Sequence, residues 1–570
     1  MSDPRTRRHG RRWVLVAVGV LAGGLLLGWA LAGMPLRSAR GRSATPAART
    51  SPAVSASSSA PSSTTVPESS GSPSPKPSAA QSPARSTSAA RSPGAVAPHP
   101  AAPPGPSPAP THPAVPCTGA ALRPGDAMQA AVDAHPAGTT FCLAAGTYRL
   151  PATIDPKAGD VFVGAPGAVL SGARVVTDFA RSGGWWVLPN QTQASAPSGD
   201  PGMECDSTHP RCVSNEGMFI DDQALTAVAG LSALGPGKFY FDYAGHAIYL
   251  ADNPTGRRVE ASVTNLAFSS SHYVTGVQVR GLVIEKFANP ASTGALTGGA
   301  GWVADGNEVR LNHGAGICMF PNDPSTGNWV VSNNHVHHNG QMGLCGQRVN
   351  GLVENNEIDH NNTAGFWYGW EAGGAKWVHT TGLVVRGNYV HDNAGIGLWT
   401  DGYNVNTLYE GNRVENNTAI GIHHEISYNA IVRSNTIRGN GFGVPNPDNA
   451  GIKINSSPNV EIYGNTLDRN ASGVILYQQA PSVTPGPEGP LEISNEYVHD
   501  NQIWMGSGYT GLVQTVGDDS YYTTHDNRFQ NNTYLLVNPT GANFYWMDGM
   551  RDRNAWVGYG QDTTGSFSAR

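Results

Sequence analysis

An asparagine repeat limits the folds open to this chain more than any other feature of its sequence. Each unit reads Asn, any residue, an aliphatic residue or Phe, two further residues and a second Asn. The first Asn of each unit lies at Asn307, Asn334, Asn356, Asn388, Asn412, Asn435, Asn465 and Asn527, and a stretched version of the unit begins at Asn495. In the first five units a glycine follows the second Asn, at Gly316, Gly343, Gly365, Gly397 and Gly421. Units 22 to 32 residues apart indicate a solenoid, a propeller or an array.

The segments between these positions are short and rich in β-branched residues that alternate with polar ones, which favours strands over helices. Asn at a fixed turn position suits a ladder in which each amide bonds to the one above and below. Glycine at a turn suits a backbone with positive φ. These features predict an all-β chain with a right-handed parallel β-helix over residues 268–540. A β-propeller is the alternative, although its blades need about 40 residues or more.

The first part of the chain predicts export. Residues 1–12 form a basic tail, and residues 13–34 form an uncharged apolar run long enough to cross a bilayer as a helix. We expect a single-pass membrane anchor with a cytoplasmic N-terminus and an extracellular β-helix; a cleaved signal peptide and a secreted protein are the alternative. Residues 35–116 are rich in Ser, Pro and Ala and predict a disordered linker, which is a spacer or an O-glycosylated stalk.

Three further segments complete the predicted organisation. Residues 117–170 read as an N-terminal cap and first coil, with a short amphipathic helix over 125–132. Residues 171–267 lose the repeat but keep strand-like runs, which predicts a β-rich insertion. Residues 541–570 are expected to form a C-terminal cap or tail.

Six cysteines all follow the linker, and an even count in an exported chain predicts disulfides. Cys318 and Cys345 occupy the same slot in successive units and should stack, which leaves the local pairs Cys117–Cys142 and Cys205–Cys212. The net charge of -6 and the lack of a basic domain argue against a nucleic-acid partner. We expect a monomer.

Strand alternation predicts where chemistry lies. One outward column should hold Cys318, Cys345, Trp367, Trp399, His423 and Lys453. The outward column two residues further on should hold Gly369, Asp401, Glu425 and Asn455. Asp401 and Glu425 should therefore be neighbours on adjacent coils. Carboxylates placed in this way suit an acid and a nucleophile at a glycosidic bond.

Side chains around this pair complete the predicted site. Glu371 and Lys376, on the long loop between units, should lean over the pair and act with His423 as further catalytic residues. An outward Trp offers an apolar face to a sugar. The predicted substrate-binding residues are Trp367, Trp370, Trp399 and Lys453.

Other roles for these residues stay open. A lyase would need a base and a cation for the uronate carboxylate, which Lys376, Lys453 or His423 can supply. Asp401 and Glu425 can instead be solvated residues or hold a structural Ca²⁺ between coils; no other cofactor is expected. His424 shares an inward slot with Thr400 and is expected to be an interior histidine.

A histidine cluster lies outside this predicted site. His335, His337 and His338 carry metal-ligating side chains, but the sequence places them in a turn beside the Asn repeat. We expect no metal there, and the spacing of the cysteines does not suggest zinc.

The Asn units, their Gly-aliphatic followers and the run 143–148 resemble the pectate-lyase-like, right-handed parallel β-helix superfamily. The resemblance covers residues 117–540 and implies a fold used by polysaccharide lyases, glycoside hydrolases, uronate epimerases and non-catalytic binders. Thr400-Asp401-Gly402 and Ile452-Lys453-Ile454 resemble fragments of polygalacturonase motifs. The paired Asp and the Gly-His-Gly of that family are absent, and His423-His424-Glu425 stands in their place.

The sequence therefore predicts an exported protein that acts on an extracellular polysaccharide, with hydrolysis favoured. A polysaccharide lyase is one alternative. A non-catalytic surface protein that binds carbohydrate, or has a structural role, is the other.

Overall fold

The computed structural model describes residues 116–193, 204–269, 274–323, 325–444, 446, 448–480 and 483–570. The predicted basic tail, membrane segment and linker lie outside these residues, apart from residue 116. Within the described part of the chain, no helix is both long and apolar enough to cross a membrane.

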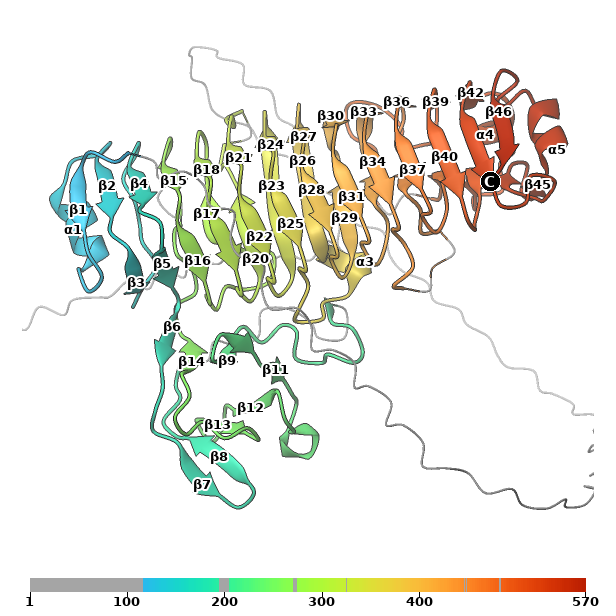
Figure 1. Cartoon of the computed structure of the whole chain (residues 1–570). Helices are drawn as coiled ribbons and strands as arrows, with labels where there is room; N and C mark the ends of the chain where they lie inside the picture. The colour runs from blue at the N-terminus through green and yellow to red at the C-terminus, as the bar shows by residue number, and fades with distance from the viewer. Residues whose placement is uncertain are drawn as a thin grey trace, which may run out of the picture. The chain divides into compact units, whose positions relative to one another are not determined.

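Three parallel ladders of short strands stack along the chain, and each coil between residues 278 and 545 contributes one strand to each ladder (Figure 1). The first ladder contains β1 (Ala120–Leu122), β2 (Thr140–Leu143), β4 (Val161–Gly164), β15 (Gln278–Arg280), β18 (Val303–Asp305), β21 (Val330–Ser332), β24 (Leu352–Glu354), β27 (Val384–Arg386), β30 (Val405–Glu410), β33 (Tyr428–Arg433), β36 (Val460–Tyr463), β39 (Tyr497–His499) and β42 (Arg528–Gln530).

The second ladder follows the first along the chain. It contains β3 (Gly146–Arg149), β5 (Ala168–Ser171), β16 (Val283–Glu285), β19 (Glu308–Arg310), β22 (His335–His337), β25 (Glu357–Asp359), β28 (Tyr389–His391), β31 (Arg413–Glu415), β34 (Thr436–Arg438), β37 (Thr466–Asp468), β40 (Gln502–Met505), β43 (Thr533–Leu536) and β46 (Ser566–Ala569).

The third ladder closes each coil from residue 278 onward. It contains β17 (Gly294–Gly298), β20 (Ala315–Met319), β23 (Met342–Val349), β26 (Gly373–Thr381), β29 (Ile396–Asp401), β32 (Ile422–Glu425), β35 (Ile452–Asn455), β38 (Val474–Gln478), β41 (Thr510–Gln514) and β44 (Phe544–Tyr545). The last of these also pairs antiparallel with β45 (Met550–Arg551). Aliphatic and aromatic side chains from the three ladders fill one continuous core.

Two asparagine ladders bond the coils together, as predicted. Asn361, for example, donates from Nδ2 to Oδ1 of Asn393 at 3.0 Å and accepts from Nδ2 of Asn339 at 3.0 Å. Both neighbours are buried, so each bond forms away from water.

The prediction that the unit starting at Asn527 continues this register is wrong. Asn527 precedes a strand of the first ladder, whereas the earlier units precede strands of the second. The column that contains Asn465 continues instead through Asn501, Asn532 and Asp562. The final bond reaches Asp562, and β46 still pairs with β43, so stacking extends into the segment expected to be a cap.

The predicted reason for the repeated glycines is also wrong for four of the five. Only Gly365 has a positive φ, at 77°. Gly343 lies within β23, where a Cβ would be 2.6 Å from Cγ2 of Ile358 and 2.8 Å from the carbonyl oxygen of Gly374. A side chain has no space there, because strands of the third ladder pass close to the Asn ladder.

Short helices and a β-rich segment accompany the ladders. Among the described residues the helices include α1 (Met128–Ala134), α3 (Tyr368–Glu371), α4 (Ser520–Thr523), α5 (Arg553–Gly558) and the 3-10 helix η1 (Leu231–Ala233). The segment between β5 and β15 forms two small sheets with a core of their own. One sheet contains β6 (Ala173–Val175), β9 (Met218–Ile220), β10 (Gln223–Ala224) and β14 (Val259–Ser262); the other contains β7 (Ala180–Ser182), β8 (Trp185–Leu188), β11 (Thr226–Ala227), β12 (Lys238–Asp242) and β13 (Ala247–Leu250).

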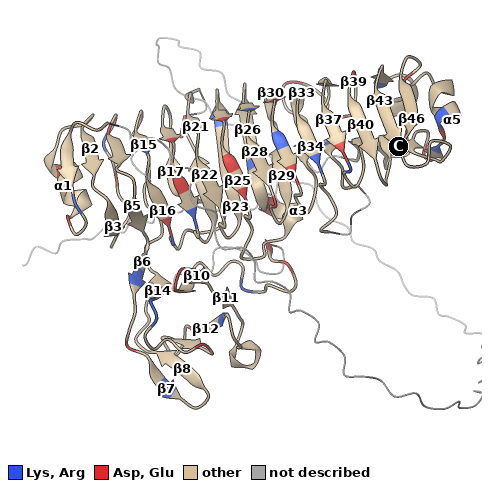
Figure 2. Cartoon of the chain, in the orientation of Figure 1, with Lys and Arg blue, Asp and Glu red and all other residues tan. Residues whose placement is uncertain are grey.

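Disulfides link residues within the β-helix or within the insertion, and ion pairs hold the insertion to the β-helix. All three predicted disulfides are present: Cys117–Cys142, Cys205–Cys212 and Cys318–Cys345. Glu260 of β14 bonds to Arg149 at 2.6 Å and to Lys286 at 2.5 Å, and both cations belong to the β-helix. Lys and Arg are interspersed with Asp and Glu over the described residues (Figure 2).

Replacing Asn361 with Ala should destabilise the fold measurably. The change leaves the backbone N–H and the Nδ2 of Asn339 without their acceptor, and each buried donor left unpaired costs about 1–3 kcal/mol. Denaturant unfolding measures the loss. Asn429→Gly is the matched control, because it removes two exposed Asn–Asn bonds at a position where φ is 48°. Equal losses in the two variants would contradict a special role for the buried ladders.

Glu496 gives the fold a predictable pH dependence. Burial raises the pKa of this carboxyl well above its usual range, and the nearby Val460 backbone only partly opposes the shift. Above the ordinary glutamate pKa the unfolded chain loses this proton while the folded chain keeps it. Stability should therefore fall as pH rises, by about 1.4 kcal/mol per pH unit between the two pKa values.

Glu496→Gln should remove this part of the slope and make the chain more stable than the wild type at neutral pH. The free energy of unfolding of the wild type and of Glu496→Gln, measured across a range of pH, tests this prediction. Glu488→Gln, at an exposed position, is the control. An unchanged slope in Glu496→Gln would overturn the assignment.

Candidate functional site

Four polar or aromatic side chains form a column on the third ladder. Backbone register aligns Lys376, Trp399, His423 and Lys453 on β26, β29, β32 and β35. The sequence placed Trp367 in the slot that Lys376 occupies, and that prediction is wrong. A loop with α3 follows Gly365, so the strand begins only at Gly373.

Trp399 is not an exposed surface for a sugar. Only 4% of it is exposed. The ammonium of Lys376, on the preceding coil, lies 3.8 Å from the Trp399 ring centroid. The His423 ring, on the following coil, stacks with it at 5.7 Å. The predicted outward direction is correct, but neighbouring coils cover the ring.

Asp401 and Glu425 are neighbours in register, as the alternation predicted. Asp401 forms an ion pair with Lys376 at 2.8 Å. Glu425 accepts from Nε1 of Trp399 at 3.1 Å and from Nδ2 of Asn455 at 2.7 Å. Their side chains are 27% and 16% exposed, so the carboxylates reach solvent while the column beside them is buried.

Burial and neighbouring charges shift the pKa values of Glu425 and Lys376. Burial raises the pKa of Glu425, although Lys376, Lys453 and the two hydrogen bonds oppose the shift. Burial alone would lower the pKa of Lys376, but Glu371 and Asp401 outweigh it and the pKa is raised. Lys376 is therefore a fixed cation beside Asp401, while Glu425 holds its proton to a higher pH than an ordinary glutamate.

His423 and Lys453 form the other end of the column. Burial, together with Lys453, lowers the pKa of His423 well below its usual range, so the ring is neutral. Neither ring nitrogen has a hydrogen-bond partner within the described chain. Burial also lowers the pKa of Lys453, whose Nζ lies 3.8 Å from Oδ2 of Asp448 and 4.1 Å from the Tyr477 ring centroid.

The long loop supplies the remaining predicted residues. Oε1 of Glu371 lies 3.6 Å from the Lys376 ammonium, and its Oε2 accepts from Ser292 at 2.5 Å. The Trp370 carbonyl accepts from Lys376 at 3.0 Å, and its ring packs against Phe366. Trp367 is 47% exposed and is the one Trp of the predicted set that presents an open face.

A small hollow opens beside Lys376. It has a volume of about 170 Å³ and is lined by Ser292, Phe320, Met342, Cys345, Gly346, Glu371, Lys376 and Val378. The predicted catalytic residues Glu371 and Lys376 therefore meet at one edge of the cluster.

Other predictions can be placed from these contacts. His424 donates or accepts at Thr400 Oγ1 at 2.7 Å and is buried, so it is the interior histidine that was expected. Lys376 lies beside Asp401, and this ammonium would repel a Ca²⁺ bound between Asp401 and Glu425. His335 and His337 lie in β22 rather than in a turn, which corrects their predicted place.

Sequence reasoning missed two contributors. Asp448 and Tyr477 contact Lys453, but Asp448 belongs to an irregular loop with no place in the repeat. Tyr477 follows Asp401, Glu425 and Asn455 in register, so extending that column by one coil would have found it.

Comparisons with known proteins agree with this architecture. A family model described as a right handed beta helix region matches residues 241–376 and 293–467. A solved structure of XylC in complex with xylose superposes with a TM-score of 0.51, covering 75% of this chain and 82% of that one at 15% identity.

The chain folds as a right-handed parallel β-helix.

Two further solved structures match this chain with lower TM-scores. The A-module of the Azotobacter vinelandii mannuronan C-5 epimerase AlgE6 is 15% identical over 75% of this chain and 91% of that one, with a TM-score of 0.40. A structure described as a glycoside hydrolase is 11% identical over 66% of this chain and 87% of that one, with a TM-score of 0.37. No curated protein matches this β-helix protein significantly.

Proposed function

We propose that this β-helix protein hydrolyses glycosidic bonds of an extracellular polysaccharide, with Glu425 as general acid and Asp401 as nucleophile or base. The observation that carries the proposal is the different environment of two neighbouring carboxylates. Asp401 is paired with a buried ammonium, whereas burial raises the pKa of Glu425. Glycosidases typically use two carboxyl groups whose surroundings differ, so that one is a protonated acid and the other is an ionised nucleophile or base.

In this reaction Glu425 donates its proton to the glycosidic oxygen as the bond to the anomeric carbon breaks. Asp401 attacks the anomeric carbon or removes a proton from the attacking water. Water then supplies the new hydroxyl, and each cleavage yields one new reducing end. Lys376 acts as a positioning residue that holds Asp401, and exposed Trp367 offers a face to the sugar chain.

XylC holds a saccharide, xylose, in its solved complex, and we extend that ligand class to this chain as part of the proposal. The proposal includes the predicted export: a membrane-tethered monomer, with residues 35–116 as spacer, would meet polysaccharide outside the cell.

One observation favours a second candidate, cleavage by elimination at a uronate. Hydrolysis makes no use of Lys453 or of the neutral His423 ring. A lyase would use a cation to neutralise the uronate carboxylate and a base to remove the adjacent proton. Lys453 and His423 supply these two groups side by side.

Product analysis tests the choice. The purified full-length chain is incubated with neutral and uronic-acid polysaccharides, and new reducing ends and unsaturated uronates are followed together. Reducing ends without unsaturation are the expected result. Unsaturated products would replace hydrolysis with elimination. Binding without either product would instead support a surface protein that only holds carbohydrate.

A further inference from the structure

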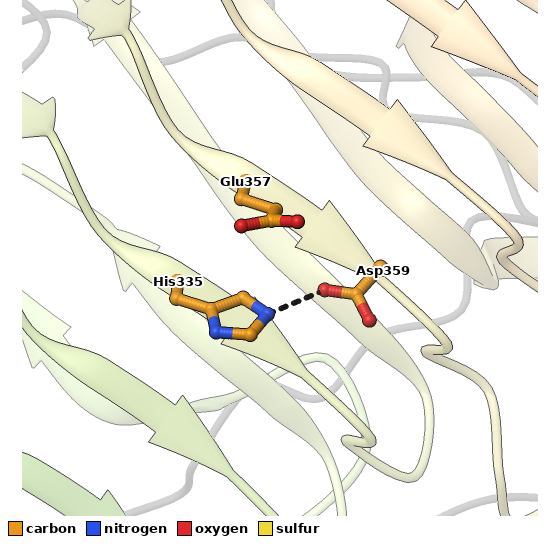
Figure 3. A group of neighbouring side chains, drawn as sticks. All are labelled: His335, Glu357 and Asp359. Carbon is orange, nitrogen blue, oxygen red and sulfur yellow. Dashed lines mark hydrogen bonds and ion pairs between the residues drawn. The ribbon is translucent and has the colours of Figure 1, made fainter. Parts of the chain in front are cut away.

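A histidine and two carboxylates converge on the second ladder, away from the third-ladder column. His335 lies on β22, and Glu357 and Asp359 lie on β25 of the next coil (Figure 3). One potential ligand atom from each side chain falls within 4.8 Å of the other two. His335 and Asp359 are buried and Glu357 is half-buried.

We propose that His335, Glu357 and Asp359 bind one divalent transition-metal ion between two coils, with Zn²⁺ as the reference ion. An imidazole nitrogen with two carboxylate oxygens suits first-row transition ions, whereas Ca²⁺ and Mg²⁺ prefer oxygen ligands alone. The proposal replaces the expectation from sequence that this region lacks a metal, which rested on placing the histidines in a turn.

The ligand distances require a modest adjustment. His335 Nε2 and Asp359 Oδ1 are 2.7 Å apart and share a hydrogen bond, while ligands around tetrahedral Zn²⁺ are about 3.3–3.5 Å apart given bonds near 2.0–2.1 Å. The ion would displace the proton between these two atoms, and rotation of the Glu357 side chain would bring in the third ligand. A fourth position remains for water.

Neighbouring histidines orient both carboxylates. Oδ2 of Asp359 bonds to Nδ1 of His360 at 2.6 Å, which leaves Oδ1 directed at His335. Oε1 of Glu357 lies 3.3 Å from Nε2 of His391, whose Nδ1 bonds to Asp392 at 2.7 Å. Outer contacts of this kind fix the direction of metal ligands.

An internal comparison separates the candidate ligands from ordinary structural pairs. His499 repeats the environment of His391: its Nε2 lies 3.3 Å from Oε1 of Glu461, and its Nδ1 bonds to Asp500 at 2.7 Å. The bridge from a histidine to a glutamate on the preceding coil is therefore a recurring structural element.

The residues beside the two bridges differ. Tyr463 stands beside Glu461 where Asp359 stands beside Glu357. Ile431 pairs in register with Glu461, where His335 pairs with Glu357. His335 and Asp359 therefore accompany the Glu357–His391 bridge but have no counterparts at the Glu461–His499 bridge. Together with Glu357 they complete the proposed set of metal ligands.

Metal titration of the full chain tests the proposal. After chelator treatment, Zn²⁺ binding is measured by calorimetry, and Co²⁺ is added separately to record visible absorption. We expect one tight Zn²⁺ per chain and the intense visible bands of low-coordinate Co²⁺. Asp359→Asn and Glu357→Gln should each weaken Zn²⁺ binding at least 10–100-fold.

Glu461→Gln, in the matching bridge, is the control and should keep wild-type affinity. Circular dichroism checks that each variant is folded. If Asp359→Asn does not fold, Glu357→Gln decides the test, because Glu357 is less buried than Asp359. The proposal is overturned if the wild type binds no Zn²⁺, if Co²⁺ gives no visible bands, or if the folded ligand variant binds Zn²⁺ as tightly as Glu461→Gln.

Discussion

Replacing Glu425 with Gln is expected to lower kcat on the polysaccharide by about 10²–10⁴-fold, the usual contribution of a general acid. The amide keeps the size of the side chain and can still bond to Asn455, but it has no proton to donate to the leaving oxygen. Because the lost interaction acts in the transition state, KM should change much less than kcat.

The pH profile supplies a second readout for Glu425. The acid must be protonated, so activity should fall as pH rises through the pKa of Glu425. Burial raises that pKa, which extends activity to higher pH than an ordinary glutamate would allow. Glu425→Gln should lose this descending limb. Exposed Glu488→Gln is the control and should keep both the rate and the profile; equal rates in both variants would remove Glu425 from the mechanism.

Lys376→Met is expected to destabilise the fold by about 3 kcal/mol and to abolish most activity. Removing one partner of a buried ion pair costs about 3–5 kcal/mol. The lower end applies because Asp401 and Glu371 are each 27% exposed, so water can solvate them. Denaturant unfolding measures the stability, and Lys376→Met with Asp401→Asn should recover part of it because the unpaired charge on Asp401 is gone.

Lys453→Met provides the matched comparison three coils further on. Its nearest carboxylate, Asp448, is 3.8 Å away, and burial lowers the pKa of Lys453. This substitution should cost less than Lys376→Met. A larger loss at Lys453 would contradict the assignment of Lys376 as the central cation of the site.

Sequence spacing predicted the features that depend on strand register. Cys318 and Cys345 pair, and Asp401 and Glu425 are neighbours, because a residue at a fixed distance from the repeat falls on the same ladder in successive coils. The Asn ladders follow from the same regularity.

Predictions failed where an irregular segment interrupts the repeat. The loop with α3 moves the strand start from Gly365 to Gly373, so Lys376 rather than Trp367 joins the column. Counting from Asn527 gave the wrong register because Asn527 and Asn532 keep the five-residue spacing of a unit but enclose β42, a strand of the first ladder.

Burial of the candidate site was the other feature that alternation did not predict. A period of two gives the direction of the Trp399 side chain but not what covers it. Its cover consists of Lys376 and His423 from neighbouring coils, which meet only when the coils stack. The metal-ligand set has the same origin, because His335 and Asp359 are separated along the chain and meet across coils.

The most direct test of the central claim compares two substrates of the same sugar. One is the polysaccharide that the wild type cleaves, and the other is an aryl glycoside whose leaving group departs without protonation. We predict that Glu425→Gln loses activity on the polysaccharide but keeps most of it on the aryl glycoside, whereas Asp401→Asn loses both. Equal losses on the two substrates for Glu425→Gln, or full activity in Asp401→Asn, would contradict the assignment of acid and nucleophile.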